Sequence, residues 1–334
     1  MKAFMVERYG DTAGVRAGEM PDPQVGADDL LVRIHAAGVN PLDLKIRDGD
    51  FKAILPYRLP RILGNDLAGV VVQMGPAVTR FAVGDEVYAR PDKDRIGTFA
   101  ELIAVHQDDV AIKPATLTMA EAASLPLVAL TAWQALVERA RVRPGQKVLI
   151  HAGAGGLGTI AVQLAKQLGA HVATTASTAN VDLVKELGAD VVIDYKKQAF
   201  ETVVDGYDVV LDTLGGETLE KSLRVLKPGG KVISVAGPPD AAFARQLGAN
   251  AILRLAMSAL SLKTRRRAKR LGVTYSFLFM RASGDQLREL TPLIDAGKIR
   301  PVVDRVFPFE ETREAMEYVE KGRAKAGKVV VAMT

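Results

Sequence analysis

An alternation of short apolar segments with helical segments, from residue 147 to residue 279, constrains the fold of this chain more than any other feature. Strand-like segments rich in Val and Ile, such as "KVLI" and "DVVLD", are followed by segments with apolar residues at helical spacing. A helix between two such strands returns the chain to the sheet in the same direction. The alternation therefore predicts a doubly wound parallel sheet. Its last and longest helical stretch is expected near residues 243–270.

The part before residue 119 has a different pattern. Short apolar stretches such as "LLVRIHAAGV" and "AGVVVQMG" are separated by Gly, Pro and Asp clusters, and no long helical period is present. This pattern predicts a β-rich region. A length of 334 residues accommodates two domains. We therefore expect an α/β protein with a β-rich domain and a parallel-sheet domain.

The sequence "GAGGLG" at residues 153–158 stands between a predicted strand and a predicted helix. Its pattern G-x-G-x-x-G gives a tight turn, close approach of a pyrophosphate and close packing of helix on strand. The start of the following helix offers unpaired N–H groups to phosphate oxygens. The cluster predicts a dinucleotide site, with these contact residues: Gly153, Gly155, Gly156, Leu157 and Gly158.

The end of the next strand indicates which dinucleotide is bound. An NAD site usually holds an Asp or Glu there, whereas this chain has Thr175, Ser177 and Thr178 and no acid before Asp182. Without a carboxylate a 2′-phosphate is not repelled, and hydroxyl groups can donate to it. No Arg or Lys lies in this stretch, so the basic part of an NADP signature is missing. The pattern favours NADPH over NADH.

Composition excludes several kinds of chemistry. The chain has no Cys, which removes disulfides, thiolate catalysis and cysteine-ligated metals. Its net charge of +5 comes from one patch, because residues 263–270 carry six positive charges. Such a local patch argues against a general nucleic-acid partner. No stretch is long and apolar enough for a membrane span, and the first residues lack the core of a signal peptide. We expect a cytoplasmic protein.

Several motifs in order resemble the medium-chain dehydrogenase/reductase superfamily, and within it the zinc-independent NADPH:quinone oxidoreductases and enone (alkenal) reductases. The resemblance covers nearly the whole chain and includes the following segments: "AAGVNPLDLKIRDG", "LPRILGNDLAGVV", "GDEVYA", "GTFAELIAV", "VLIHAGAGGLG" and "LKPGGKVISV". It implies a GroES-like catalytic domain from residues 1–121 and 280–334, and a Rossmann NADP-binding domain from residues 122–279. It also implies a homodimer formed edge to edge through "VTYSFLF".

The resemblance also implies roles for individual residues. Asn40 and Tyr57 are the candidate catalytic residues: the first beside the nicotinamide, the second at the substrate rim. Thr131, Tyr195 and Lys328 match positions near the nicotinamide, the 2′-phosphate and the cofactor phosphates, respectively. Simpler roles are a helix cap for Asn40, a loop anchor for Tyr57 and a solvated amine for Lys328. The chain departs from the enone reductases at Asn180, where they often carry Lys.

Zinc-dependent relatives place a Cys in the segment matching "GVNPLD" and a His-Glu pair in the segment matching "GND". This chain has Asn40 and Asn65-Asp66 there, and its four histidines are scattered and expected to be incidental strand-edge residues. Neutral amides without a thiolate cannot build a tetrahedral zinc site. The prediction is therefore a site without metal.

These features predict an NADPH-dependent enzyme that transfers hydride to a quinone or an α,β-unsaturated carbonyl compound. Such acceptors need only hydrogen-bond donors for the developing oxyanion and a proton from water. An alternative is an enoyl-thioester reductase of the same superfamily. Another is a protein that binds RNA or a membrane surface through the basic patch at 263–270, which follows the apolar stretch "ILRLAMSALSL". The simpler interpretation of the patch is the solvated end of a crossover helix.

Overall fold

The structure, a computed structural model, describes residues 1–52 and 55–333. The chain forms two compact units. The first unit contains Met1–Leu130 and Arg281–Thr334, and the second contains Thr131–Met280. Helix α3 (Pro126–Trp133) spans the first boundary between these units.

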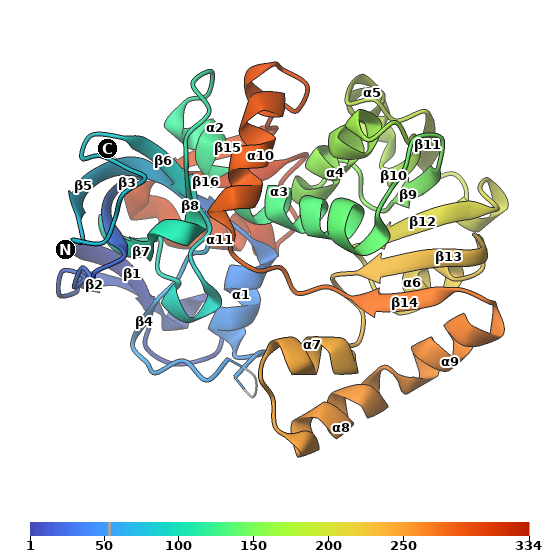
Figure 1. Ribbon diagram of the computed structural model, residues 1–334, viewed down its shortest axis with the longest axis horizontal. Coiled ribbons are helices and arrows are strands. Elements are labelled where there is room, and N and C mark those ends of the chain that lie inside the picture. The colour runs from blue at the N-terminus through green and yellow to red at the C-terminus, as the bar shows by residue number, and fades with distance from the viewer. Residues whose placement is uncertain (53–54, 334) are drawn as a thin grey trace. The chain divides into compact units, whose positions relative to one another are not determined.

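The second unit contains a parallel sheet with the strand order β11-β10-β9-β12-β13-β14 in its described residues (Figure 1). Most residues of its strands are buried, as expected where helices cover both faces. The predicted doubly wound sheet is thereby confirmed. The strands are β9 (Lys147–Ile150), β10 (His171–Ala176), β11 (Val191–Asp194), β12 (Tyr207–Asp212), β13 (Leu226–Ser234) and β14 (Thr274–Phe277).

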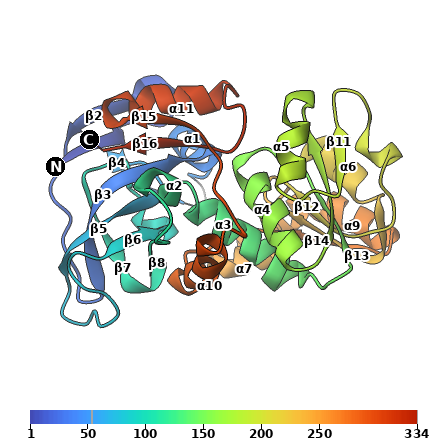
Figure 2. The ribbon, with the colours of Figure 1, turned by 90° about the horizontal axis from the view of Figure 1, so that it is seen from above.

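Helices α4 and α5 cover one face of this sheet, and α6 and α9 lie on the other face (Figure 2). The direction of winding reverses between β9 and β12, and ligands of open α/β sheets bind at the carboxyl ends of strands at such a point. The helical elements of the unit are α4 (Gly156–Gln167), α5 (Val181–Glu186), α6 (Gly216–Ser222), α7 (Ala241–Gln246), α8 (Ala251–Leu260), α9 (Leu262–Arg270), η4 (Gln134–Ala140), η5 (Thr178–Asn180) and η6 (Phe200–Thr202).

The single long helix expected near residues 243–270 is instead three helices, α7, α8 and α9. Gly248 has a left-handed φ of 65°, which ends α7. The Asn250 side chain then accepts a hydrogen bond from the Leu253 N–H at 2.9 Å and starts α8. Ser261 lies between α8 and α9. Local capping residues thus divide this stretch into three helices, although its apolar residues recur at helical spacing throughout.

The first unit is mainly antiparallel. Over the described residues, one sheet has the order β15-β16-β3-β5-β6-β8, with β7 also paired to β3, and a second has the order β2-β1-β4. The strands are β1 (Lys2–Val6), β2 (Val15–Glu19), β3 (Asp29–Val39), β4 (Arg61–Ile62), β5 (Leu67–Met74), β6 (Glu86–Ala89), β7 (Leu102–His106), β8 (Val110–Ile112), β15 (Val303–Pro308) and β16 (Lys328–Ala332).

Strand β16, near the end of the chain, pairs antiparallel with β3, which places Val330 opposite Gly38. One apolar core therefore joins residues from both parts of the unit, including Leu30, Phe99 and Val331. The helical elements are α1 (Pro41–Asp48), α2 (Met119–Ala123), α10 (Gly284–Asp295), α11 (Thr312–Glu320), η1 (Thr12–Gly14), η2 (Lys93–Arg95), η3 (Gln107–Asp109) and η7 (Phe309–Glu311).

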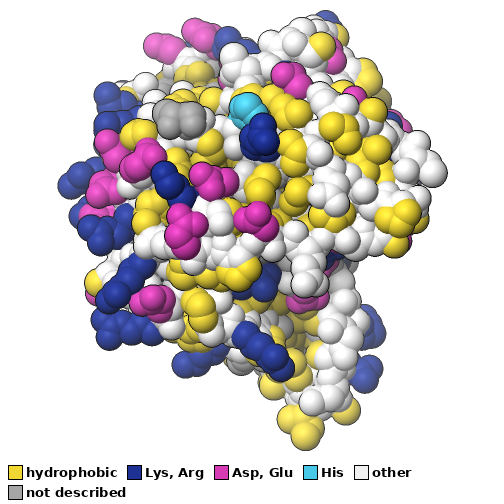
Figure 3. Space-filling model, turned by 90° about the vertical axis from the view of Figure 1, so that its left-hand side faces the viewer, with side chains coloured by type: hydrophobic (Ala, Val, Ile, Leu, Met, Phe, Trp, Pro, Cys, Tyr) yellow, Lys and Arg dark blue, Asp and Glu magenta, His cyan; other side chains and the backbone are white. Residues whose placement is uncertain are grey.

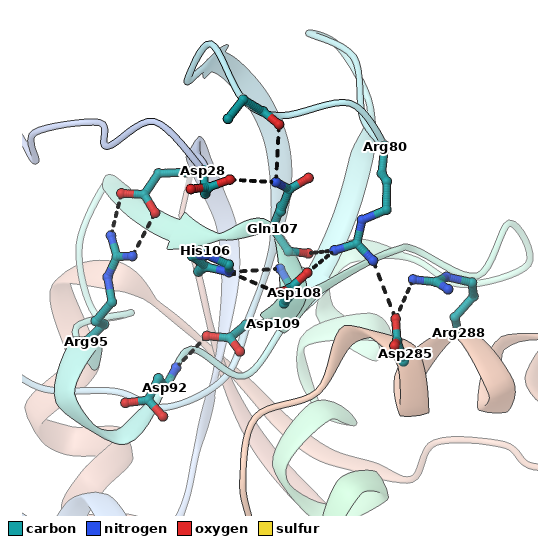
Figure 4. A network of polar contacts seen from close by, with 12 residues as sticks. Asp28, Arg80, Asp92, Arg95, His106, Gln107, Asp108, Asp109, Asp285 and Arg288 are labelled. Carbon is teal, nitrogen blue, oxygen red and sulfur yellow. Dashed lines mark hydrogen bonds and ion pairs between the residues drawn. The ribbon is translucent and has the colours of Figure 1, made fainter.

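An exposed network of charges also joins the two parts of the first unit (Figure 4). Arg80 donates to Asp108 at 2.6 Å and lies 3.4 Å from Asp285 at the start of α10, and Arg288 pairs with the same Asp285. The side of the molecule drawn in Figure 3 carries basic and acidic side chains interspersed. Within the described residues, no helix combines the length and apolarity required to cross a bilayer.

Candidate functional site

The glycine cluster forms the loop between β9 and α4 and the first turn of that helix. A Cβ on Gly153 would lie 2.1 Å from the Thr174 Oγ1, and one on Gly158 would lie 2.1 Å from the Ala152 carbonyl oxygen. These two glycines are therefore required by packing. Gly155 is different, because it is exposed and a Cβ there would meet only the Ala152 oxygen at 3.3 Å. The outer side of the loop is open at Gly155.

The open side coincides with the start of α4, which begins at Gly156 and continues through Leu157 and Gly158. The first N–H groups of a helix have no partner within the helix, and the helix dipole gives this end a positive potential. Hence the loop at residues 153–158 fits the pyrophosphate of a dinucleotide.

Thr175 supports this loop from below. Its hydroxyl oxygen accepts a hydrogen bond from the Ala152 N–H at 3.0 Å, and its carbonyl oxygen accepts one from the Gly153 N–H at 2.9 Å. The side chain is only 4% exposed. The Thr175 hydroxyl thus faces the loop and holds the turn, and its expected contact with the cofactor stays a prediction.

His151, expected to be an incidental strand-edge residue, is fully buried beneath the same loop. Its Nε2 lies 2.8 Å from the Ser222 hydroxyl, its Nδ1 lies 3.3 Å from the Thr175 hydroxyl, and its ring packs edge to face on Phe200. Burial lowers the pKa of His151 to about 4, against the opposing effect of Asp212. The imidazole is therefore neutral at pH 7. Its place directly between the strand and the first glycine is the sequence signal that could have identified it.

The predicted 2′-phosphate residues lie where β10 and β11 end side by side. Ser177 is half-buried and accepts a hydrogen bond from the Asn180 amide at 3.3 Å, and Thr178 is exposed. Tyr195 follows β11 and is 60% exposed, with its N–H bonded to the Ala176 carbonyl oxygen. The structure thus brings Ser177, Thr178 and Tyr195 to one sheet edge.

One carboxylate and two lysines at the end of β11 also lie at this edge. The sequence pattern at the end of β10 did not predict them. Asp194 accepts a hydrogen bond from the Thr178 hydroxyl at 2.7 Å, and this bond lowers the pKa of Asp194. The Lys197 ammonium lies 3.4 Å from the same carboxylate, and Lys196 is exposed beside it. Register places Asp194 opposite Ala176, so these charges lie next to the hydroxyl groups.

In the first unit, Asn40, Asp66 and Lys328 form a buried polar cluster. The Lys328 ammonium donates to Asn40 Oδ1, to the Val39 carbonyl oxygen at 3.1 Å and to Asp66 Oδ2 at 3.2 Å. The Asn40 amide donates to Asp66 Oδ2 at 2.8 Å and to the Gly38 carbonyl oxygen at 3.3 Å. The cluster thereby satisfies all three ammonium donors and both amide donors. Lys328 is therefore buried and is not the solvated amine of the simpler interpretation, whereas Asn40 stands at the N-cap position of α1.

A second group of buried side chains continues this cluster. Asp43, fully buried in α1, accepts hydrogen bonds from the Asn40 N–H at 2.7 Å and the Asn65 amide at 2.6 Å. Burial raises the pKa of Asp43 to about 6 despite these two bonds. Arg90 donates to the Asn65 Oδ1 at 3.3 Å, and its Nε has no partner among the described residues. These residues come from separate segments, and only the "GND" motif pointed to Asn65.

Tyr57 is half-buried in the loop before β4. Its hydroxyl group donates to the Lys93 carbonyl oxygen at 2.6 Å, and the Arg61 guanidinium lies 5.1 Å from the centre of its ring. Burial raises the pKa of Tyr57 to about 12, so the phenol is protonated at pH 7. Its proton is engaged with Lys93, which leaves the oxygen as an acceptor.

Thr131 lies on α3 and is 5% exposed. One turn earlier on this helix, the Leu127 N–H donates to Asp66 Oδ1 at 2.7 Å. The Asp66 carboxylate thus fixes the start of the helix that carries Thr131. The assigned roles of Thr131, Asn40, Tyr57 and Lys328 toward a ligand stay predictions.

The side chains of the buried cluster indicate whether a metal ion can bind beside them. A lysine ammonium occupies the side of Asp66 that faces Asn40, and a cation there opposes the binding of a second cation. Among the described residues, no three His, Cys, Asp or Glu side chains are grouped so that they could hold a metal ion.

Comparison with known proteins identifies the family. The profile for an alcohol dehydrogenase GroES-like domain matches residues 26–115, and the profile for a zinc-binding dehydrogenase matches residues 187–331. The chain is 36% identical over 345 residues to the chloroplastic NADPH-dependent alkenal/one oxidoreductase of Arabidopsis thaliana, covering 99% of this chain and 79% of that protein.

Solved structures give the same result. The quinone oxidoreductase of Coxiella burnetii superposes with a TM-score of 0.87 at 32% identity, covering 100% of this chain and 99% of that one. The Escherichia coli quinone oxidoreductase complexed with NADPH superposes with a TM-score of 0.81 at 25% identity, covering 99% and 100%. With a GroES-like first unit and a doubly wound second unit, the chain belongs to the medium-chain dehydrogenase/reductase family, among the relatives of the quinone and alkenal oxidoreductases.

Proposed function

We propose that this protein is an NADPH-dependent oxidoreductase that transfers hydride, without a metal, to a quinone or to an α,β-unsaturated carbonyl compound. The observation that carries the proposal is the loop at residues 153–158, whose open side at Gly155 coincides with the start of α4 at the switch point of a parallel sheet. The relatives that share the whole chain carry names of this activity.

The second unit binds the cofactor. The N–H groups at Gly156 and Leu157 are donors for the pyrophosphate oxygens, and Gly155 leaves room for them. Hydroxyl groups of Ser177 and Tyr195 are donors for a 2′-phosphate, and Lys196 adds the positive charge that Asn180 does not supply. Bound NADPH supplies a hydride from its nicotinamide ring.

The first unit holds the residues proposed for the substrate side. Asn40 and Lys328 act as positioning residues, because the cluster with Asp66 uses their donors and fixes the segment from Gly38 to Asp43. Tyr57 presents an aromatic face on which a planar quinone or enone can pack. A substrate whose carbon is already electron-poor needs no stronger acid than water for the oxygen that becomes charged.

The absence of metal in the reaction is supported by the residues at the position of zinc ligands in zinc-dependent relatives. The Lys328 ammonium beside Asp66 neutralises the carboxylate there. Asn40 offers a neutral amide where those relatives have a cysteine thiolate, and zinc binds an amide only weakly. We also propose a homodimer, because β14 is an edge strand of the parallel sheet among the described residues and an edge strand can pair with a second copy. A cytoplasmic location stays a prediction.

The test is reduction of three substrates with NADPH and with NADH: a naphthoquinone, an alkenal and a crotonyl thioester. NADPH labelled with deuterium at C4 of the nicotinamide should place the label on the β-carbon of the alkenal product. Turnover should persist in excess EDTA. An enoyl-thioester reductase would instead prefer the crotonyl thioester. Loss of turnover with EDTA and its return with zinc would contradict the proposal.

A further inference from the structure

The segment 241–273 has an extreme charge composition. It contains eight Lys and Arg residues and no Asp or Glu, which leaves a net charge of −3 for the rest of the chain. The structure divides this segment into α7, α8 and α9 beside β14 (Figure 1). A strongly positive local field attracts an anionic partner.

Helix α8 turns an apolar stripe toward solvent. The stripe follows helical spacing i, i+3, i+4, i+7, i+8, and each of its side chains is exposed. Three of them are large: Ile252, Leu255 and Leu260 are 80%, 73% and 64% exposed. In this helix only Met257 is buried. The members of the stripe are Ile252, Leu255, Ala256, Ala259 and Leu260.

Helix α9 presents a basic face with the same kind of spacing. Its exposed basic residues lie at i, i+3, i+6 and i+7, namely Lys263, Arg266, Lys269 and Arg270. Lys263 lies 3.4 Å from Glu220, which also pairs with Arg267. No carboxylate among the described residues pairs with Arg266, Lys269 or Arg270.

The two helices are joined rigidly. The Arg265 guanidinium of α9 donates to the Ser258 carbonyl oxygen at 2.8 Å and to its hydroxyl at 2.7 Å in α8. The Ser261 hydroxyl donates to the Met257 carbonyl oxygen at 3.2 Å. A helix with an exposed apolar stripe is thus held next to a helix that carries Arg266, Lys269 and Arg270.

We propose that the stripe on α8 and the basic face of α9 bind the surface of an anionic lipid bilayer. The aliphatic side chains enter the boundary between headgroups and acyl chains, and Arg266, Lys269 and Arg270 contact lipid phosphates. Charge complementarity selects an anionic partner, and the exposed Ile and Leu side chains favour a bilayer over RNA, which offers them no apolar phase. This inference is independent of the proposed function.

The test is flotation of the full chain with vesicles of phosphatidylcholine alone or with 30% phosphatidylserine. We expect binding only to the anionic vesicles, weakened by salt. Each Lys or Arg near such a surface is worth about fivefold in affinity, so R266Q/K269Q/R270Q should bind roughly 100-fold more weakly. I252S/L255S should lose at least about tenfold.

Matched controls separate local from general effects. K298Q/R313Q/R323Q removes the same charge from exposed positions in the first unit, and V83S/V203S removes two exposed valines. Both should bind vesicles like the wild type, and all variants should retain their thermal unfolding midpoint. Loss of as much vesicle affinity in K298Q/R313Q/R323Q as in R266Q/K269Q/R270Q would overturn the proposal. So would tight binding of polyuridylate that I252S/L255S leaves unchanged, or a dimer that this variant dissociates while no vesicle binding is seen.

Discussion

The Lys328 ammonium lies 3.2 Å from the Asp66 carboxylate, although 262 residues separate them in the sequence, and both side chains are buried. Asn40 bridges the pair by accepting from Lys328 and donating to Asp66. This contact connects strand β16 to the segment before β5. It therefore joins the two parts of the first unit by charge as well as by strand pairing.

Removal of the Lys328 ammonium should destabilise the fold. Lys328→Met leaves Asp66 as a buried carboxylate without its cation, which costs about 3–5 kcal/mol. Urea denaturation measures the loss, and Lys328→Met/Asp66→Asn should recover part of it. The dissociation constant for NADPH in the folded variant should stay within about twofold. A tenfold or larger rise would show instead that the ammonium contacts the cofactor phosphates.

Two glycines of the loop, Gly155 and Gly158, should separate folding from binding. Gly158→Ala places a Cβ 2.1 Å from the Ala152 oxygen and should cost about 1–3 kcal/mol of stability. Gly155→Val has a backbone conformation that Val accepts (φ −74°, ψ 168°) and should keep the unfolding midpoint while NADPH binding is lost. Calorimetry and fluorescence titration measure the two effects. NADPH affinity equal to that of the wild type in Gly155→Val would contradict the assignment of the loop.

Cofactor choice should respond to residues at the end of β10. Ser177→Asp adds a negative charge where the 2′-phosphate is proposed and should weaken NADPH at least about tenfold, with little effect on NADH. Asn180→Lys should tighten NADPH, more at low salt than at high salt. Thr175→Asp is predicted to misfold instead, since it buries a carboxylate under the loop. Equal affinity of the wild-type protein for NADPH and NADH would contradict the proposed preference for NADPH.

Asp43 should make the protein less stable as pH rises. Its folded pKa of about 6 exceeds the ordinary value of 3.8, so the folded state holds the proton more tightly. The stabilising contribution is complete below about pH 4 and is lost through pH 6, a change of about 3 kcal/mol. Asp43→Asn should therefore gain stability relative to wild type over this window. A difference that is constant with pH would show that Asp43 does not titrate there.

His151 should have the opposite effect. Its folded pKa of about 4 is below the ordinary 6.5, so the unfolded state binds the proton more tightly. Its contribution is complete above about pH 6.5 and is lost as pH falls to 4, by about 3 kcal/mol. His151→Gln keeps a donor toward Ser222 and should unfold less readily than wild type on acidification. Acid unfolding followed by circular dichroism measures this, and identical acid midpoints would argue against it.

Local patterns predicted the second unit well. Each strand and the glycine turn are encoded by neighbouring residues, so periodicity and the G-x-G-x-x-G spacing were sufficient for the sheet and its loop. The orientation of Thr174 and Thr175 was not predictable, because both faces of a parallel sheet are buried and alternation does not distinguish them. The buried cluster of Asn40, Asp66 and Lys328 in the first unit was also predicted only in part. It depends on pairing between positions 40, 66 and 328, which no local pattern encodes.

The pairing of β3 with β16 also has a consequence for the order in which the chain acquires structure during its synthesis. The ribosome makes the second unit as one continuous segment, which can fold as soon as it emerges. Val39 must wait for Val329, 290 residues later, before β3 gains this neighbour. At about 5–20 residues per second the delay is roughly 15–60 s. During that interval the end of β3, residues 36–39, keeps an open edge, which makes the nascent first unit a candidate for chaperone binding.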